Sequence, residues 1–165
     1  MPTLPSPVTR PSVRTPPATP FTSVQLGDLV ARFAEQRGLW LPHVRFESPD
    51  RYYTRLEHSE SHEVWLLSWL PGQGTDIHGH GGSRGAFTVV RGELTESVFP
   101  PTAHRRHPKP RKLLTGTART FGPRYIHQVT NEAVAPAVSI HAYSPPLSTM
   151  SYYRQLHDGR LVTDP

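Results

Sequence analysis

Residues 71–92 read PGQGTDIHGHGGSRGAFTVVRG, and this stretch decides the fold that the sequence indicates. It places two histidines, His78 and His80, on either side of a single glycine. If residues 77–80 are extended, the two-residue period of a β-strand puts both imidazoles on one face and Ile77 on the other. Two imidazoles on the same face of a strand can bind one metal ion together. The motif therefore predicts part of a metal site.

A third histidine, His127, follows within residues 121–131, FGPRYIHQVTN, after a Gly-Pro turn. A lone histidine is more often an ordinary hydrogen-bonded residue than a ligand, but the combination of all three is specific. No carboxylate lies between His80 and Arg91, so the ligands are three neutral imidazoles, unlike the two histidines and one carboxylate of many iron oxygenases. A divalent ion held in this way keeps its full charge, which favours an anionic ligand such as a thiolate. Three histidines also suit zinc, so the ligands alone leave the metal open.

Short strands separated by glycine or proline clusters make up most of the remaining sequence. They are predicted at residues 64–70, 86–90, 93–99, 113–114, 119–121, 125–130 and 137–143. The first is a continuous apolar run, which suits a strand buried on both faces. The second and third flank Arg91-Gly92 and predict a β-hairpin. Many short strands with turn signals indicate a sandwich or a closed barrel.

One amphipathic helix is predicted ahead of these strands, over residues 24–37. Its apolar residues recur at helical spacing and are Leu26, Leu29, Val30 and Phe33. Ser23 is the predicted N-cap, and Gly38 is the predicted residue after the helix end. We expect the apolar face of this helix to pack on the core.

The 165 residues suffice for one domain with tails. Many of the 19 prolines fall before residue 21, where little apolar surface is present to offset the entropy of ordering. We therefore expect residues 1–22 to form a disordered proline-rich tail and residues 23–165 to form a single domain. A proline-rich docking peptide is the alternative interpretation of the tail.

Composition excludes several classes of protein. The chain has no cysteine, which rules out disulfides, thiolate metal sites and a cysteine nucleophile. No apolar run approaches the ~20 residues of a membrane span, and the first residues lack the apolar stretch of a secretory signal, so we expect a cytoplasmic protein with no membrane partner. The formal net charge is +5, and much of it lies in residues 104–112, HRRHPKPRK. The prolines there favour a solvated loop over a nucleic-acid site, so no nucleic-acid partner is expected.

Three stretches resemble thiol dioxygenases of the cysteine dioxygenase type, a family of the cupin superfamily. They are YTR at 53–55, IHGHGGSRGAF at 77–87, and the segment 127–146, which contains HQVTN and PAVSIHAYSPP. The resemblance implies an all-β fold, a cupin (jelly-roll) β-barrel with an N-terminal α-helix. It also implies Fe(II) as the cofactor, and it assigns the three iron ligands to His78, His80 and His127.

The same resemblance implies a catalytic relay of Ser139, His141 and Tyr143. The strand period agrees with it, because it places these three on one face and Val138, Ile140 and Ala142 on the other. In the family the position of Gly85 is a cysteine in animal members, where it is linked to the tyrosine; with no cysteine in the chain, Tyr143 must remain a free phenol. Gly79 also stands where the family commonly has aspartate.

The resemblance further assigns Arg55 to the substrate carboxylate, with Tyr53 beside it. A guanidinium presents a planar pair of donors that matches a carboxylate. The implied reaction converts L-cysteine and O₂ to cysteine sulfinic acid, in a protein expected to be a monomer. Two alternatives stay open: 3-mercaptopropionate or another small thiol acid as the substrate, and a cupin that binds metal without oxygenase activity, including a zinc isomerase type.

Overall fold

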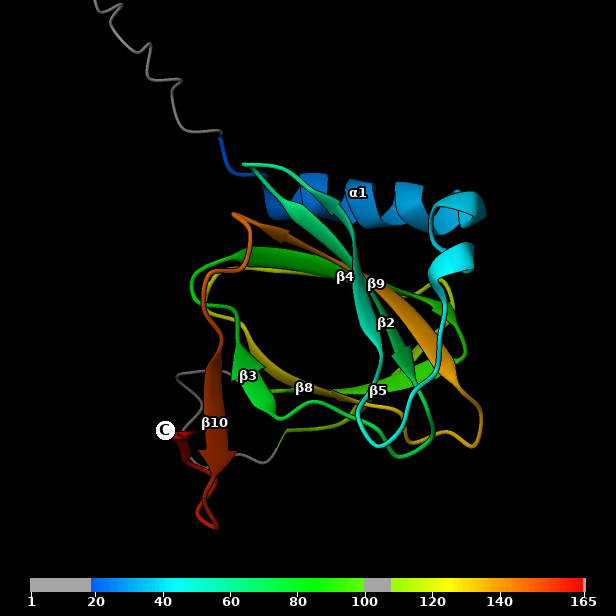
Figure 1. Cartoon of the computed structure of the whole chain (residues 1–165). Coiled ribbons are helices and arrows are strands. Elements are labelled where there is room, and N and C mark those ends of the chain that lie inside the picture. Colours follow the sequence, from blue (N-terminus) through cyan, green and yellow to red (C-terminus); the bar gives the residue numbers. More distant parts are fainter. Residues whose placement is uncertain (1–18, 100–107, 165) are drawn as a thin grey trace, which may run out of the picture.

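The structure is a computed structural model that describes residues 19–99 and 108–164 (Figure 1). Residues 1–18 of the predicted tail and residues 104–107 of the basic stretch lie outside the described residues. Within the described ranges, no helix has the length and apolar character that a membrane span requires.

The described chain contains helices at its beginning and strands from residue 53 onward. In order these are α1 (Ser23–Glu35), η1 (Arg37–Leu39), η2 (Leu41–His43), β1 (Tyr53–His58), β2 (Glu63–Trp69), β3 (Ile77–Gly79), β4 (Arg84–Arg91), β5 (Glu93–Val98), β6 (Arg111–Leu114), β7 (Ala118–Phe121), β8 (Ile126–Thr130), β9 (Ala137–Ser144), β10 (Ser151–Gln155) and β11 (Leu161–Asp164). The predicted all-β fold with an N-terminal helix is confirmed. The sequence pattern missed β1, β10 and β11, which carry several exposed polar residues and no continuous apolar run.

Two antiparallel sheets face each other and enclose the interior of a barrel (Figure 1). One sheet has the strand order β1-β2-β9-β4-β7, and the other has the order β11-β10-β3-β8-β5-β6. Helix α1 covers the outer face of the first sheet, over β4 and β9 (Figure 1). The central strands of the first sheet, β2, β9 and β4, are therefore largely buried on both faces, as the apolar run at 64–70 predicted.

Helix α1 begins and ends close to its predicted bounds. Its N-cap is Thr22 rather than Ser23: the Thr22 hydroxyl accepts from the Gln25 amide, and the Gln25 side chain accepts from the Thr22 amide, which forms a capping box. The helix stops at Glu35, and Gly38 lies in the short helix η1 instead. All four predicted apolar residues are buried, and they share a cluster with the outward side chains Val138, Ile140 and Ala142 of β9.

The predicted hairpin of residues 86–90 and 93–99 is wrong. Strands β4 and β5 follow each other in sequence but belong to opposite sheets, so the chain crosses from one sheet to the other at Gly92. Gly92 has a φ of 75°, and a Cβ atom there would lie 2.7 Å from the Pro136 carbonyl oxygen. The local sequence signals a tight turn correctly, but whether the strands beside it pair depends on the packing of residues far away in the chain.

Candidate metal centre

The three predicted ligands lie together inside the barrel, on the second sheet. His78 on β3 is directly opposite His127 on β8, which places their imidazoles side by side on the inner face. His80 follows immediately after β3. The candidate ligand nitrogens of the three residues all lie within 4.8 Å of one another, and each residue is at most 5% exposed.

Two of these histidines are oriented by hydrogen bonds on the side away from the cluster. The Nδ1 of His78 is 2.9 Å from the Asp76 carbonyl oxygen, and the Nδ1 of His127 is 2.9 Å from Oε1 of Glu96. Because both acceptors lack a proton, each Nδ1 carries a hydrogen, and Nε2 is the nitrogen whose lone pair is left for a metal ion. A metal ligand needs that lone pair, so the tautomers fit a metal ion.

His80 provides the test of whether the site fits a metal. Both of its ring nitrogens are buried and have no hydrogen-bond partner among the described residues. A buried polar atom without a partner is unfavourable by about 1–3 kcal/mol, and a bound ion would remove this penalty for one nitrogen. The residues present therefore fit a metal ion held by three histidines.

Burial also keeps His78 and His80 neutral. Burial, with a smaller effect of the neighbouring His127, lowers the pKa of His78 to about 4. Burial, followed by the same neighbour, lowers the pKa of His80 to about 2. Neutral imidazole is the form that binds metals, so no proton has to be removed from these two residues near pH 7.

A buried carboxylate that the sequence analysis did not single out lies behind His127. Glu96 on β5 is 0% exposed and accepts from the Tyr125 hydroxyl at 3.0 Å and from the Arg119 Nε at 3.1 Å, in addition to its bond with His127. Burial alone would raise the pKa of Glu96, but the His127 and Tyr125 hydrogen bonds and the Arg119 charge outweigh it and hold this pKa below its usual value. The sequence did carry one signal for Glu96. It stands two residues after the apolar Leu94, so the strand period places both on the same inward face.

The structure also brings the three residues of the predicted relay together. Ser139, His141 and Tyr143 of β9 all point into the barrel, with 2.8 Å between the Ser139 hydroxyl and His141 Nε2 and 3.4 Å between His141 Nδ1 and the Tyr143 hydroxyl. Ser139 already accepts from the Trp69 indole at 2.9 Å. Its own proton then goes to Nε2, because His141 offers the acceptor that this buried hydroxyl requires. Nδ1–H of His141 consequently faces the Tyr143 oxygen, and the phenol proton is free to point into the pocket.

Burial fixes the protonation of this relay as well. It lowers the pKa of His141 well below its usual value, with His127 and Arg51 as smaller contributors. It raises the pKa of Tyr143, so the phenol keeps its proton through the physiological range. The relay is therefore neutral, with the Tyr143 hydroxyl as a hydrogen-bond donor.

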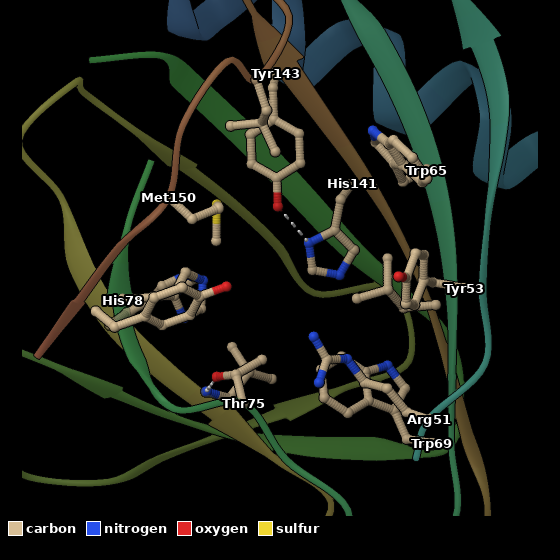
Figure 2. Close-up of a pocket in the computed structure, with 14 residues that line it drawn as sticks. Arg51, Tyr53, Trp65, Trp69, Thr75, His78, His141, Tyr143 and Met150 are labelled. Carbon is tan, nitrogen blue, oxygen red and sulfur yellow. Dashed lines mark hydrogen bonds between the residues drawn. The ribbon is translucent and has the colours of Figure 1, made fainter. Parts of the chain in front are cut away.

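Two histidines of the metal cluster, His78 and His127, and two residues of the relay, His141 and Tyr143, line one cavity of about 250 Å³. Figure 2 shows His78 on one side of this space, Arg51 and Trp69 on another, and the Tyr143 hydroxyl and His141 directed toward it. Trp65, Leu67 and Met150 contribute apolar surface to the lining. The pocket thus combines histidine nitrogens, the Tyr143 hydroxyl and one cationic side chain within a largely apolar wall.

The cationic side chain that lines the pocket is Arg51. The sequence analysis instead assigned the substrate carboxylate to Arg55. Arg55 is absent from the described pocket lining: its side chain is 48% exposed, is 3.7 Å from a Glu63 carboxylate oxygen and lies over the Trp65 ring. Arg51 lies over the Trp69 ring, and its Nη1 donates to the Gly74 carbonyl oxygen at 3.1 Å. The Nε of Arg51 is buried without a hydrogen-bond partner. Tyr53, also assigned from the sequence, does line the pocket.

Comparison with protein families gives a match over most of the chain. The matching family model is described as cysteine dioxygenase type I and covers residues 23–156. The cysteine dioxygenase type 1 of Danio rerio is 30% identical over 127 residues, which are 70% of this chain and 62% of that protein. The Homo sapiens protein of the same name is 29% identical over 126 residues, with the same coverage of 70% and 62%. The chain thus spans about three fifths of the length of these curated relatives.

Solved structures with lower sequence identity share the fold. A Klebsiella pneumoniae protein with a double-stranded β-helix domain has a TM-score of 0.58 at 18% identity, covering 69% of this chain and 93% of that chain. A cupin superfamily protein of Desulfitobacterium hafniense has a TM-score of 0.53 at 10% identity, covering 64% and 87%. These likenesses show the cupin fold. The range that matches the family model, residues 23–156, contains the three histidines and also Ser139, His141 and Tyr143. The chain belongs to the cysteine dioxygenase type I family.

Proposed function

We propose that this protein is an iron-dependent thiol dioxygenase that converts L-cysteine and O₂ to cysteine sulfinic acid. The observation that carries the proposal is the shared pocket, in which His78 and His127 of the three-histidine cluster, the Tyr143 hydroxyl and the Arg51 cation meet. Neutral ligands leave the charge of a divalent ion available to an anionic thiolate. Family membership supports the same reaction class.

Arg51 is the proposed partner of the substrate carboxylate. Its guanidinium is held by the Trp69 ring and the Gly74 carbonyl, and its buried Nε still lacks an acceptor. A carboxylate that entered the pocket would supply that acceptor and neutralise the charge. The earlier assignment to Arg55 is the competing proposal, because Arg55 lies beside Trp65, another residue of the lining.

Iron held by the three histidines would bring thiolate and O₂ together and exchange electrons with both. The overall change, RSH + O₂ → RSO₂H, transfers both oxygen atoms to sulfur and requires no external reductant. The protein's own contribution is to fix the substrate through its carboxylate and to exclude water with the apolar wall. The Tyr143 phenol, positioned by His141 and Ser139, is the proposed hydrogen-bond donor to the reacting oxygen atoms or to the carboxylate.

A second candidate substrate is 3-mercaptopropionate. None of the described residues that line the pocket is an aspartate or glutamate, so the chain offers the amino group of cysteine no carboxylate partner there. A thiol acid without that amino group would lose only a bond to the metal. The two substrates would therefore make the same contact with Arg51, and only cysteine would offer an amino group to the metal.

The experiment is to load the protein with Fe(II), determine the iron content and record oxygen uptake with L-cysteine, 3-mercaptopropionate and cysteamine. We expect turnover with cysteine, equal or lower turnover with 3-mercaptopropionate, and poor turnover with cysteamine, which lacks the carboxylate. His127→Ala should lose both iron and oxygen uptake, whereas His43→Ala, at an exposed position, should lose neither. Iron-loaded protein that consumed oxygen with none of these thiols would refute the proposal.

The monomeric state and the cytoplasmic location stay predictions made from the sequence. Sedimentation velocity of the iron-loaded protein would test the first of them.

A further inference from the structure

The three histidines of the metal cluster differ in what lies behind them. His78 is bonded to a neutral backbone carbonyl, at 2.9 Å, and His80 to no acceptor among the described residues. His127 alone is bonded to a carboxylate, Oε1 of Glu96, at 2.9 Å. The cluster is therefore not three equivalent imidazoles, because one ligand has a negative charge directly behind it.

Strand geometry explains how Glu96 reaches His127. Val98 of β5 is the residue directly opposite His127, and Glu96 lies two residues earlier on the same inward face. Such a diagonal neighbour is within reach of a long side chain. Glu96 is 0% exposed, so water does not screen the charge that it places beside the imidazole.

A cation from the opposite sheet balances this carboxylate. Arg119 on β7 donates from Nε to Oε2 of Glu96 at 3.1 Å, and its side chain is only 29% exposed. The Tyr125 hydroxyl donates to Oε1 at 3.0 Å and so shares that oxygen with His127. Each carboxylate oxygen thus has a defined donor, and Glu96 is held in one orientation between the two sheets.

We propose that Glu96 is a positioning residue that fixes His127 with its Nε2 toward the metal and, together with Arg119, sets the electron density that this ligand donates. The inference rests on the metal site of the proposed function and does not depend on which thiol is oxidised. A carboxylate behind a ligand histidine makes the imidazole a stronger donor. It also favours the higher oxidation state of a bound iron, because the more positive ion gains more from a nearby negative charge.

The first test is a titration of metal-free protein with Co(II), followed by the absorption spectrum of the bound ion. Glu96→Gln should weaken Co(II) binding about 10- to 100-fold and change the spectrum. The matched control is Glu93→Gln, which removes a carboxylate from the same strand, where it pairs with the exposed Lys112 at 3.1 Å. The control should bind Co(II) as the wild type does. Equal affinity and spectrum for Glu96→Gln and the wild type would overturn the proposal.

The second test separates the electronic effect from a loss of structure, and it also serves if Glu96→Gln does not fold. The Fe(III)/Fe(II) potential should rise in Glu96→Gln, which loses the negative charge, and fall in Arg119→Gln, which leaves that charge uncompensated. General loosening of the site would shift both potentials in the same direction. An unchanged or raised potential in Arg119→Gln would contradict the role assigned to the pair. Thiol oxidation plays no part in either measurement, so the proposed reaction can fail while this inference holds.

Discussion

At the scale of single residues, Arg51 and Arg55 present the clearest choice in the molecule. Only three residues separate them along the chain, but Arg51 lines the pocket and Arg55 does not. Their surroundings differ, because Glu63 already pairs with Arg55 while the Nε of Arg51 has no partner. A cation already paired with a carboxylate is a weaker anchor for a substrate carboxylate than one whose only described hydrogen bond is to a neutral carbonyl oxygen.

Arg51→Ala should therefore cripple thiol oxidation, and Arg55→Ala should affect it much less. Truncating one member of a buried charge pair costs about 2–5 kcal/mol, which is roughly 30-fold or more in kcat/KM. Steady-state oxygen uptake with L-cysteine checks this, with iron content as the control that should stay constant in both variants. If Arg55→Ala lost more activity than Arg51→Ala, Arg55 would instead be the partner of the substrate carboxylate.

Tyr143→Phe should lower kcat on the order of 100-fold while iron content stays at the wild-type level. The phenol takes part through its hydroxyl, and the ring of the variant would keep its stacking against His80, at 5.2 Å between centroids. Tyr152→Phe is the matched control, since Tyr152 lines the same pocket but is 46% exposed. Unaltered turnover in Tyr143→Phe would remove the relay from the mechanism.

At the scale of elements, the contact between β4 and β7 supports the metal site from behind. Gly85 on β4 faces Phe121 on β7, and a Cβ atom at Gly85 would collide with the Phe121 ring. That ring stacks on His80, with 4.8 Å between centroids. The absence of a side chain at Gly85 is therefore required by the ring that holds a ligand in place.

Gly85→Ala should destabilise the protein by about 1–3 kcal/mol, the usual effect of overpacking a core, and should also weaken metal binding because Phe121 has to move. Gly79→Ala is the control within the site: its Cβ would meet its nearest neighbours at 3.6 Å, an ordinary contact distance. Urea unfolding and Co(II) titration measure both effects. Equal losses in the two variants would show that the Phe121 contact is not the cause.

At the scale of the whole molecule, the two sheets enclose histidines whose burial lowers their pKa. In the metal-free protein, the pKa of His78 is about 4 and that of His80 about 2, below the usual value of 6.5. The unfolded chain therefore binds more protons than the folded chain once the pH falls below 6.5. It follows that stability is greatest above 6.5 and is lost as the pH falls toward 4.

We expect the free energy of unfolding of the metal-free protein to fall between pH 6.5 and 4 by up to about 1.4 kcal/mol per pH unit for each such histidine. Urea unfolding in the presence of a chelator, at a series of pH values, measures this slope. His80→Gln should show a shallower slope, because it removes one of the groups that titrate only on unfolding. An identical slope in that variant would show that His80 is accessible to protons in the folded state.

The amino-acid sequence by itself determined the features that repeat with a local period. The helix of residues 24–37, the run at 64–70 that is buried on both faces, and the inward face of residues 139, 141 and 143 all follow from neighbours in sequence. The three histidines were found for the same reason, because each stands near a turn signal and within or directly after a short strand.

Only the tertiary structure decided which strands pair and which charged groups meet the site. It placed β4 and β5 in opposite sheets, brought Arg51 into the pocket in place of Arg55, and set Glu96 behind His127. Local periodicity gives the face on which a side chain lies but not the residue it meets across the barrel. That partner depends on register, bulges and packing between segments that are distant in sequence.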